Sequence, residues 1–570
     1  MRLQHGSFLR SLRRPVLLWL LAAPLAGVLA GCAGIGGSGL FSAPAPRLAV
    51  FLVVDGLPQR QVLAYRDQLA PDGFARFLDR GTWFSEAHYR HAFTVTAAGH
   101  AAMLTGAYPH RTGIIGNDWR AIATGAQVYN TGDTNYTYIG AATKPLDGTS
   151  PNHLKVETVG DVLRRTVPGS KVIGISGKDR GAILPAGHAG TAYMYMGESG
   201  TFATSTYYMK QHPAWVDAFN AARPADRFFK AEWKPLLPEA AYARSLPDSQ
   251  PWFGPAGGKL PMMMGTPADD TPGPRFYGAL LASPFADALS LQFARAAIAG
   301  ERLGLDADTP DILIVSLSGH DYVNHRWSAE SRLSHDHFLQ LDRMLQALFK
   351  DLDETIGADN YVVALTADHG FMQAPEVSQA QGLGGGRVAG NALLVAVNAE
   401  LEKRFGAPKL AAFLSAQAVV LDRKLLAERK LDFDTVADAA RAALLAQPAI
   451  GAAYTRKELR NGGSTSQAGA PFFDAMRKAW HPDVSGDVQY VLKPYWMMGA
   501  SVTTHGSPHP YDTQVPLLLW GPRWVGRGRV DTPVEPIDLA PTLAALLKVE
   551  TPSGSEGKPL PLPLSFGVGR

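Results

Sequence analysis

The chain has 570 residues, of which 46% are hydrophobic and 18% charged, a balance typical of a globular protein and not of a disordered or fibrous one. Its formal net charge of +3 is small for this length, and no block of lysine and arginine indicates a nucleic-acid surface. We therefore expect no nucleic-acid partner and a monomeric protein. The single cysteine excludes an internal disulfide, so stability must come from the core and from any bound metal.

The first 31 residues have the pattern of a lipoprotein signal peptide. Arginines precede an apolar run from Pro15 to Ala30, which is short for a membrane span and ends in small residues. Residues 29–32, Leu-Ala-Gly-Cys, resemble a bacterial lipobox, in which the cysteine is lipidated and becomes the mature N-terminus. We expect export to the periplasm and a membrane anchor through a lipid on Cys32. A plain signal peptide with an incidental cysteine is the alternative.

Residues 32–46, rich in Ala, Gly, Ser and Pro, predict a flexible tether. From residue 47 onward, short apolar runs alternate with helical patterns such as Pro71–Arg80 and Ser331–Ile356. The runs predict buried parallel strands at Arg47–Val54, Lys171–Ile175, Asp311–Leu317, Tyr361–Thr366 and Val515–Trp520. The alternation predicts an α/β domain over 47–570, with a mostly parallel central sheet and helices on both faces. Ligands of such sheets bind outside the carboxyl ends of the strands.

Two stretches interrupt this alternation, at about 200–280 and 376–490. The second contains an amphipathic helix at Phe433–Leu445 and a strand at Asp487–Leu492. We interpret both stretches as inserted segments that cap or wall the site, with separate domains as the alternative.

Carboxylates and histidines follow the predicted strands at four places. The residues are Asp55, the pair Asp321 and His325, the dipeptide Asp368-His369, and His505. Each place alone is a weak signal, because an Asp-His dipeptide is usually a turn and a D-x-x-x-H pair usually faces solvent. Their co-occurrence at strand ends predicts a metal site, and nitrogen and carboxylate ligands without thiolate favour zinc. The number of ligands suits two ions.

A hydroxyl and two cations complete the candidate site. Thr94 and Thr96 precede a small-residue helix, whose N-terminus would favour a nearby phosphate, although a threonine there is more often a plain helix cap. Spacing does not choose between the two. Asn117 lies on a predicted tight turn. Lys178 and Arg180 follow the second strand and could clamp a phosphoryl group, although the residues alone favour a solvated loop in which Asp179 balances the charge.

These residues, in this order, resemble the alkaline phosphatase superfamily, over a stretch from about residue 47 to the segment Ile537–Leu543. The nearest resemblance is to the phosphate-irrepressible alkaline phosphatases, whose threonine nucleophile lies in a T-x-T-A-P-G-H context. Residues 94–100 here read Thr-Val-Thr-Ala-Ala-Gly-His, with Ala98 in place of the proline. Residues 176–188 are similar to the Lys-x-Arg clamp of the same enzymes.

The resemblance implies an alkaline-phosphatase-like core and a zinc-dependent phosphate monoesterase that acts through a phosphothreonine intermediate. Thr96 would be the nucleophile, and Asn117, Lys178 and Arg180 would bind phosphoryl oxygens. One Zn²⁺ would be held by Thr96 with Asp55, Asp368 and His369, and a second Zn²⁺ by Asp321, His325 and His505. We expect His100, His188, His320 and His509 to have structural or supporting roles.

Three other functions were weighed. A phosphodiesterase or nucleotide pyrophosphatase of the same superfamily would share the metal ligands and Asn117, but would normally lack the Lys178/Arg180 clamp. A cysteine-derived sulfatase nucleophile is excluded within the domain because Cys32 is the only cysteine. A lipid-anchored binding protein without turnover would be expected to have lost a ligand, and every expected ligand is present.

Overall fold

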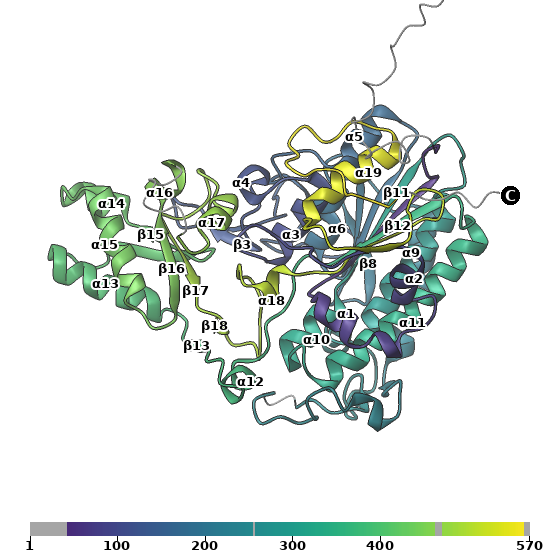
Figure 1. The fold of residues 1–570 in the computed structure, drawn as a ribbon, viewed down its shortest axis with the longest axis horizontal. Coiled ribbons are helices and arrows are strands. Elements are labelled where there is room, and N and C mark those ends of the chain that lie inside the picture. The colour runs from purple at the N-terminus through teal and green to yellow at the C-terminus, as the bar shows by residue number, and fades with distance from the viewer. Residues whose placement is uncertain (1–42, 255–256, 462–469, 564–570) are drawn as a thin grey trace, which may run out of the picture. The chain divides into compact units, whose positions relative to one another are not determined.

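The computed structural model describes residues 43–254, 257–461 and 470–563 (Figure 1). The predicted signal peptide, Cys32 and residues 33–42 of the predicted tether lie outside these ranges. In the described part of the chain, no helix combines the length and the apolar character needed to cross a membrane.

A ten-stranded sheet forms the centre of the fold. In spatial order its strands are β20 (Gly528–Val530), β2 (Thr82–Phe84), β19 (Leu517–Trp520), β12 (Tyr361–Thr366), β1 (Leu48–Val54), β11 (Asp311–Leu317), β6 (Val172–Ser176), β7 (Thr191–Met196), β8 (Thr201–Ser205) and β5 (Tyr138–Ile139). The five strands from β12 to β7 are parallel to one another. Four of them were predicted, and β7 was not. The prediction for Val515–Trp520 was wrong in direction, because β19 runs antiparallel to β12.

The central strands are apolar because both faces of the sheet are covered. Every residue of β1, β11 and β12 is buried, so no face requires polar residues. Contacts place two groups of helices against the sheet (Figure 1). The first group is α3 (Thr96–Thr105), α5 (Val159–Thr166), α6 (Asp179–Ala186) and α19 (Leu539–Leu547). The second is α2 (Phe74–Arg80), α9 (Pro284–Glu301), α10 (Gly319–Trp327) and α11 (Arg332–Thr355).

The second predicted insertion builds its own sheet and its own core. Its four antiparallel strands, in spatial order, are β14 (Ala411–Ser415), β15 (Ala418–Leu421), β17 (Val488–Leu492) and β16 (Ile450–Thr455). Apolar side chains of α13 (Ala392–Phe405) and α15 (Phe433–Leu445) pack on it, and α15 has the bounds predicted. The chain enters through β13 (Gly386–Val388) and leaves through its parallel partner β18 (Trp496–Met498), so the insertion extends beyond residue 490. We call residues 386–498 the inserted lobe.

The first predicted insertion is less separate from the core. Residues 201–205 form β8 of the main sheet, which the sequence did not predict. Beyond them, the short hairpin of β9 (Glu232–Trp233) and β10 (Met262–Met263) precedes α8 (Pro274–Leu280). The Trp233 indole donates to Asp336 on α11 at 2.6 Å, which fixes this segment to the helix layer.

Candidate metal centre and phosphoryl site

The candidate residues lie close together because the four parallel strands β1, β6, β11 and β12 end at the same edge of the sheet. In register, Val54 of β1 pairs with Leu317 of β11, and Ser176 of β6 pairs with Ser316 of β11. The chain segments that follow these strands therefore emerge at one edge of the sheet, which is where open α/β sheets bind ligands. These segments carry Asp55 after β1, Lys178 after β6, Asp321 and His325 on α10 after β11, and Asp368 and His369 after β12.

One group of possible metal ligands comprises Asp55, Asp368 and His369, all of them fully buried. One ligand atom from each lies within 4.8 Å of the others. His369 Nε2 is 3.5 Å from Asp55 Oδ1 and 3.3 Å from Asp368 Oδ2. Thr96 Oγ1 lies 3.5 Å from the same nitrogen. The structure thus brings together the four residues that the resemblance assigned to one ion.

A second group comprises Asp321, His369 and His505. Asp321 Oδ1 is 3.5 Å from His505 Nε2 and 3.4 Å from His325 Nε2. His325, which the sequence placed with Asp321 and His505, therefore faces the same oxygen. The rings of His369 and His505 stack with centroids 3.4 Å apart. The two groups consequently adjoin each other and share His369, which spacing in the sequence did not indicate.

The hydrogen bonds around these side chains fit a divalent cation. Each histidine donates its Nδ1–H to a backbone carbonyl at 2.9 Å: His325 to Thr503, His369 to Gly370 and His505 to Thr94. This tautomer leaves Nε2 as the ligand atom, an arrangement that metal-binding histidines commonly show. Burial lowers the pKa of His369 and His505, which favours the neutral, ligating imidazole.

The carboxylate oxygens of the same groups also fit a divalent cation. Asp55 Oδ1, Asp321 Oδ1 and Asp368 Oδ2 are buried and accept no hydrogen bond, and each faces a histidine Nε2. A buried oxygen without a donor is unfavourable unless a cation compensates it. Burial raises the pKa of Asp55, and the nearby Asp368 raises it further. For Asp321, burial acts in the same direction, but Lys178 and the histidines hold its pKa well below the usual value.

The two threonines have different partners. Thr94 Oγ1 donates to the Ser507 carbonyl at 2.8 Å, which commits that hydroxyl to a backbone contact. Thr96 is the first residue of α3, after the N-cap Val95, and its hydroxyl faces His369. Gly99 lets this helix approach closely, because a Cβ there would lie 2.1 Å from the Asp368 carbonyl oxygen. Of the two hydroxyls, the one on Thr96 therefore lies beside the possible metal ligands, and the one on Thr94 is bonded to backbone.

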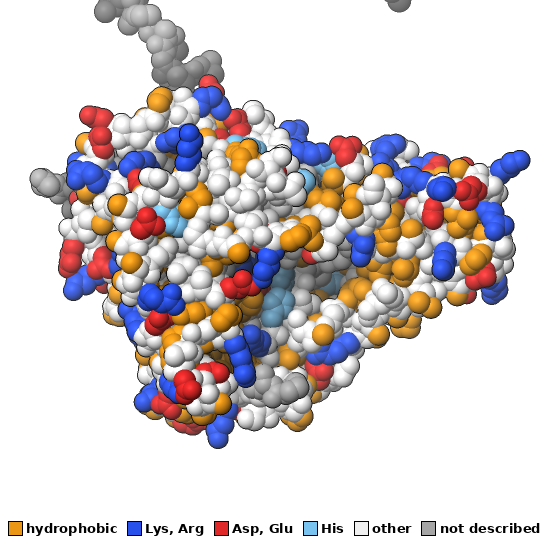
Figure 2. Space-filling model, turned by 180° about the vertical axis from the view of Figure 1, so that it is seen from behind, with side chains coloured by type: hydrophobic (Ala, Val, Ile, Leu, Met, Phe, Trp, Pro, Cys, Tyr) orange, Lys and Arg blue, Asp and Glu red, His pale blue; other side chains and the backbone are white. Residues whose placement is uncertain are grey.

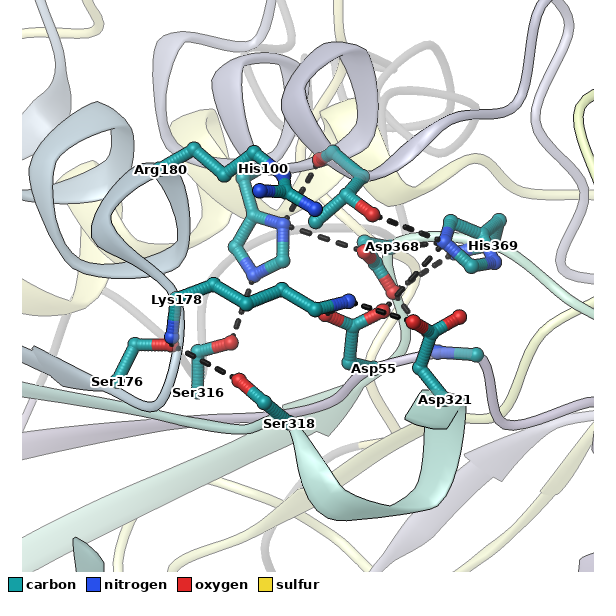
Figure 3. Close-up of polar contacts among 12 residues, drawn as sticks. Asp55, His100, Ser176, Lys178, Arg180, Ser316, Ser318, Asp321, Asp368 and His369 are labelled. Atoms are coloured by element: carbon teal, nitrogen blue, oxygen red, sulfur yellow. Dashed lines mark hydrogen bonds and ion pairs between the residues drawn. The ribbon is translucent and has the colours of Figure 1, made fainter. Parts of the chain in front are cut away.

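His100 connects the helix to the cluster. Its Nδ1 lies 2.8 Å from the Thr96 carbonyl oxygen and 3.3 Å from Asp368 Oδ2, and its Nε2 lies 2.8 Å from Ser316 Oγ (Figure 3). These contacts hold Asp368 in place, which is the supporting role expected from the sequence. His188, by contrast, lies outside the cluster, where it contacts Asp161 and the Leu154 carbonyl.

Lys178 and Arg180 reach the cluster from the start of α6 (Figure 3). Lys178 Nζ donates to Asp55 Oδ2 at 2.7 Å and to Asp321 Oδ2 at 2.6 Å, so it bridges one carboxylate from each group. Although burial alone would lower the pKa of Lys178, Asp321 and Asp55 raise it above the usual value. Lys178 is therefore a buried, permanently charged ammonium between the two groups.

A hairpin of β3 (Asp118–Arg120) and β4 (Gln127–Tyr129) positions the remaining residues. Asn117 precedes it and accepts a hydrogen bond on Oδ1 from the Ala97 N–H at 2.9 Å. Tyr129 ends it, accepts a hydrogen bond from Arg180 Nη1 at 3.1 Å and donates to Asp179 Oδ1 at 2.6 Å. The sequence did not single out Tyr129, because a lone tyrosine on a short strand carries no motif.

An α/β sheet with a carboxylate–histidine cluster beside a helix-initiating threonine is the arrangement that the resemblance to the alkaline phosphatase superfamily led us to expect. The chain belongs to the type I phosphodiesterase / nucleotide pyrophosphatase family, whose model matches residues 49–512.

The similar proteins include two named alkaline phosphatases. PafA of Elizabethkingia meningoseptica is 35% identical over 95% of this chain and 98% of its own. PhoV of Synechococcus elongatus is 33% identical over 90% and 92%. A solved structure of PafA covers 91% of this chain and 99% of its own with a TM-score of 0.82 at 33% identity, which confirms the fold class. A PafA variant substituted at one threonine, one asparagine, one lysine and one arginine matches equally well.

Proposed function

We propose that this chain is an exported, zinc-dependent alkaline phosphatase that releases inorganic phosphate from phosphate monoesters through a phosphothreonine intermediate on Thr96. The observation that carries the proposal is the position of the Thr96 hydroxyl, 3.5 Å from the histidine shared by two adjoining groups of possible metal ligands.

Thr96 is suited to be the nucleophile. Its oxygen attacks phosphorus, a Thr96 Oγ1–P bond forms, and the bond from phosphorus to the ester oxygen breaks on the opposite side. The Thr96 hydroxyl gives up its proton as the new bond forms, and the leaving alkoxide takes up a proton and departs as the alcohol. A water molecule then attacks the phosphothreonine, which releases phosphate and restores the hydroxyl. The N-terminus of α3 favours the negative charge on the attached phosphate.

The polar side chains around Thr96 would bind the phosphoryl oxygens. Asn117 Oδ1 is occupied by the Ala97 N–H, so its amide NH₂ is the group left to donate to a phosphoryl oxygen. Lys178 and Arg180 bring two buried positive charges, whose pKa values carboxylates and tyrosines raise. A loose transition state with charge on three oxygens is stabilised by such fixed donors and charges.

We assign Asp55, Asp368, His369 and Thr96 to one Zn²⁺, and Asp321, His325 and His505 to a second. Two such cations would favour the Thr96 alkoxide and stabilise the charge on the leaving oxygen. The nitrogen and oxygen donors, without thiolate, favour zinc among the common divalent ions. Elemental analysis of the purified protein tests this assignment. Two zinc atoms per chain are expected, and a preparation that is fully active with another metal alone would contradict it.

The substituted PafA variant supports the assignment of the nucleophile and of the three residues that bind phosphoryl oxygens. Its threonine and asparagine are as far apart in the chain as Thr96 and Asn117, and its lysine and arginine are separated by one residue, as Lys178 and Arg180 are. Whereas a relative from Myroides odoratus at 34% identity over 90% of the chain is named a calcium-transporting ATPase, PafA and PhoV, which match most of the chain, are named alkaline phosphatases. This favours monoester over diester hydrolysis, although the family model is named for phosphodiesterases.

The choice between monoester and diester is testable with one pair of substrates. A monoester carries nearly two negative charges and a diester one, so Lys178 and Arg180 attract the monoester more strongly. We expect the purified enzyme to have a much higher kcat/KM for 4-nitrophenyl phosphate than for bis-4-nitrophenyl phosphate. An equal or higher value for the diester would instead identify a phosphodiesterase.

We also propose that the protein is a periplasmic, monomeric lipoprotein anchored through Cys32, a residue outside the described structure. A Cys32→Ser variant should move from the membrane fraction to the soluble periplasmic fraction while it retains activity. Unchanged fractionation would remove the lipid anchor from the proposal.

A further inference from the structure

A cavity of about 210 Å³ lies beside the second group of possible ligands. His505 and the adjoining Gly506 and Ser507 form part of its wall, and residues of β17 and β18 from the inserted lobe form another part. Figure 2 shows histidine side chains in a hollow of the surface, with hydrophobic side chains beside it.

The position of the cavity relates it to the leaving group. Thr96 Oγ1 lies next to His369, in the group that contains Asp55 and Asp368. Because displacement at phosphorus is in line, the leaving oxygen departs on the side away from Thr96. His505 belongs both to the group assigned to that oxygen and to the cavity wall. The alcohol attached to the leaving oxygen can therefore extend into the cavity.

The walls contributed by the lobe are mostly apolar, with Gln417 as the polar exception. Trp496 and Met498 of β18 and Tyr490 of β17 supply aromatic and thioether surfaces, and Met372, from outside the lobe, adds another thioether. The Tyr490 hydroxyl lies 3.4 Å from the Met498 sulfur, so this polar group is paired with another residue of the cavity wall. Thioethers and aromatic rings make favourable and adaptable contacts with apolar groups. A cavity of roughly 150 Å³ is known to hold one benzene ring, so this one is large enough for a single ring.

The residues that line the cavity also favour uncharged leaving groups over negatively charged ones. No lysine or arginine is among the described residues that line it. Asp512 does line it, and its Oδ1 is buried without a hydrogen-bond partner, while its Oδ2 accepts from Ser507. Burial raises the pKa of Asp512 to about 7, so this carboxyl group carries only part of a negative charge at neutral pH. A second phosphate or carboxylate on the substrate would still lose hydration in the cavity, with no lysine or arginine among the described lining residues to balance its charge.

We propose that this cavity is the leaving-group subsite, and that it selects monoesters of uncharged alcohols that carry one aromatic or similarly sized apolar group. The inference rests on the proposed function, since it needs a phosphate monoester at Thr96. It also assigns a role to the inserted lobe, which supplies the specificity surface through β17 and β18 while the main sheet supplies the chemistry.

The first experiment compares phenyl phosphate with methyl phosphate in a Trp496→Ala variant. Because each substrate is compared with itself in the unchanged enzyme, differences in intrinsic reactivity cancel. We expect kcat/KM to fall about tenfold for phenyl phosphate and less than about twofold for methyl phosphate. The matched control is Val395→Ala on α13 of the same lobe, where the side chain is 65% exposed and outside the cavity, and both values should stay unchanged. Equal losses on the two substrates would overturn the subsite.

A second experiment needs no variant, and it decides the question alone if Trp496→Ala does not fold. The unchanged enzyme is assayed on 4-ethylphenyl phosphate and 4-(carboxymethyl)phenyl phosphate, whose rings are alike and which differ in the remote negative charge. A kcat/KM higher by about tenfold for the ethyl compound supports the subsite. Equal values overturn it while leaving the proposed function intact, whereas no phosphate from any of these monoesters would overturn both.

Discussion

Separate substitutions of Thr94 and Thr96 by valine test the proposed nucleophile most directly, because valine keeps the shape of threonine and removes only the hydroxyl. Thr94→Val deletes the donor of a buried 2.8 Å hydrogen bond and leaves the Ser507 carbonyl without it. Such a loss costs about 1–3 kcal/mol of folding free energy. The Thr94 carbonyl, which holds His505, is unaffected. We expect a lower Tm and a kcat within about threefold of the unchanged enzyme.

Thr96→Val should behave in the opposite way. Its hydroxyl makes one long contact of 3.5 Å with His369, so in the metal-free protein its removal should leave the Tm nearly unchanged. Loss of a covalent nucleophile should lower kcat by about 10⁴-fold or more. Acid quenching of the unchanged enzyme during turnover, followed by peptide mass spectrometry, should place a phosphate on Thr96 only. If Thr94→Val abolishes turnover and Thr96→Val does not, the assignment of the nucleophile is wrong.

Four further predictions concern the clamp, its support, the metal and pH. Lys178→Ala and Arg180→Ala should each lower monoester kcat/KM by about 10²–10³-fold and diester kcat/KM much less; comparable losses on both would mean a structural role. Tyr129→Phe removes the hydroxyl that contacts both Arg180 and Asp179, so it should lower monoester kcat/KM several-fold and also lower the Tm; an unchanged kcat/KM would contradict the positioning role of Tyr129. Chelation should lower the Tm, since it leaves buried carboxylate oxygens uncompensated, and added Zn²⁺ should restore it; a Tm insensitive to chelator would contradict the metal site. Burial lowers the pKa of His91 from 6.5 to about 3, and neither ring nitrogen has a hydrogen-bond partner. Between pH 6.5 and about 3, acid protonates this histidine in the unfolded chain only, so the free energy of unfolding should fall by about 1.4 kcal/mol per pH unit. The Tm of His91→Phe should depend less on pH over this range, and an unchanged pH dependence would refute this cause.

The sequence by itself determined the four parallel strands β12, β1, β11 and β6 at the centre of the sheet and the set of residues at their carboxyl ends. Runs such as Asp311–Leu317 are apolar throughout because both faces of the sheet are covered, so they could be recognised without the structure. Polar residues directly after such runs must lie at the carboxyl edge, which is why Asp55, Lys178 and Asp368 could be placed together. The helix Phe433–Leu445 was found with its full bounds because an amphipathic period is a local property.

Strand direction and side-chain contacts that depend on residues distant in the chain were decided by the tertiary structure alone. The direction of β19 follows from its pairing with β12, and an apolar run reads the same in either direction. Thr96 differs from Thr94 only because Ser507 occupies the Thr94 hydroxyl and His369 faces the other. Tyr129 gains its role solely through Arg180. Hydrogen bonds and ion pairs across such separations are set by how the elements pack, and no local pattern encodes them.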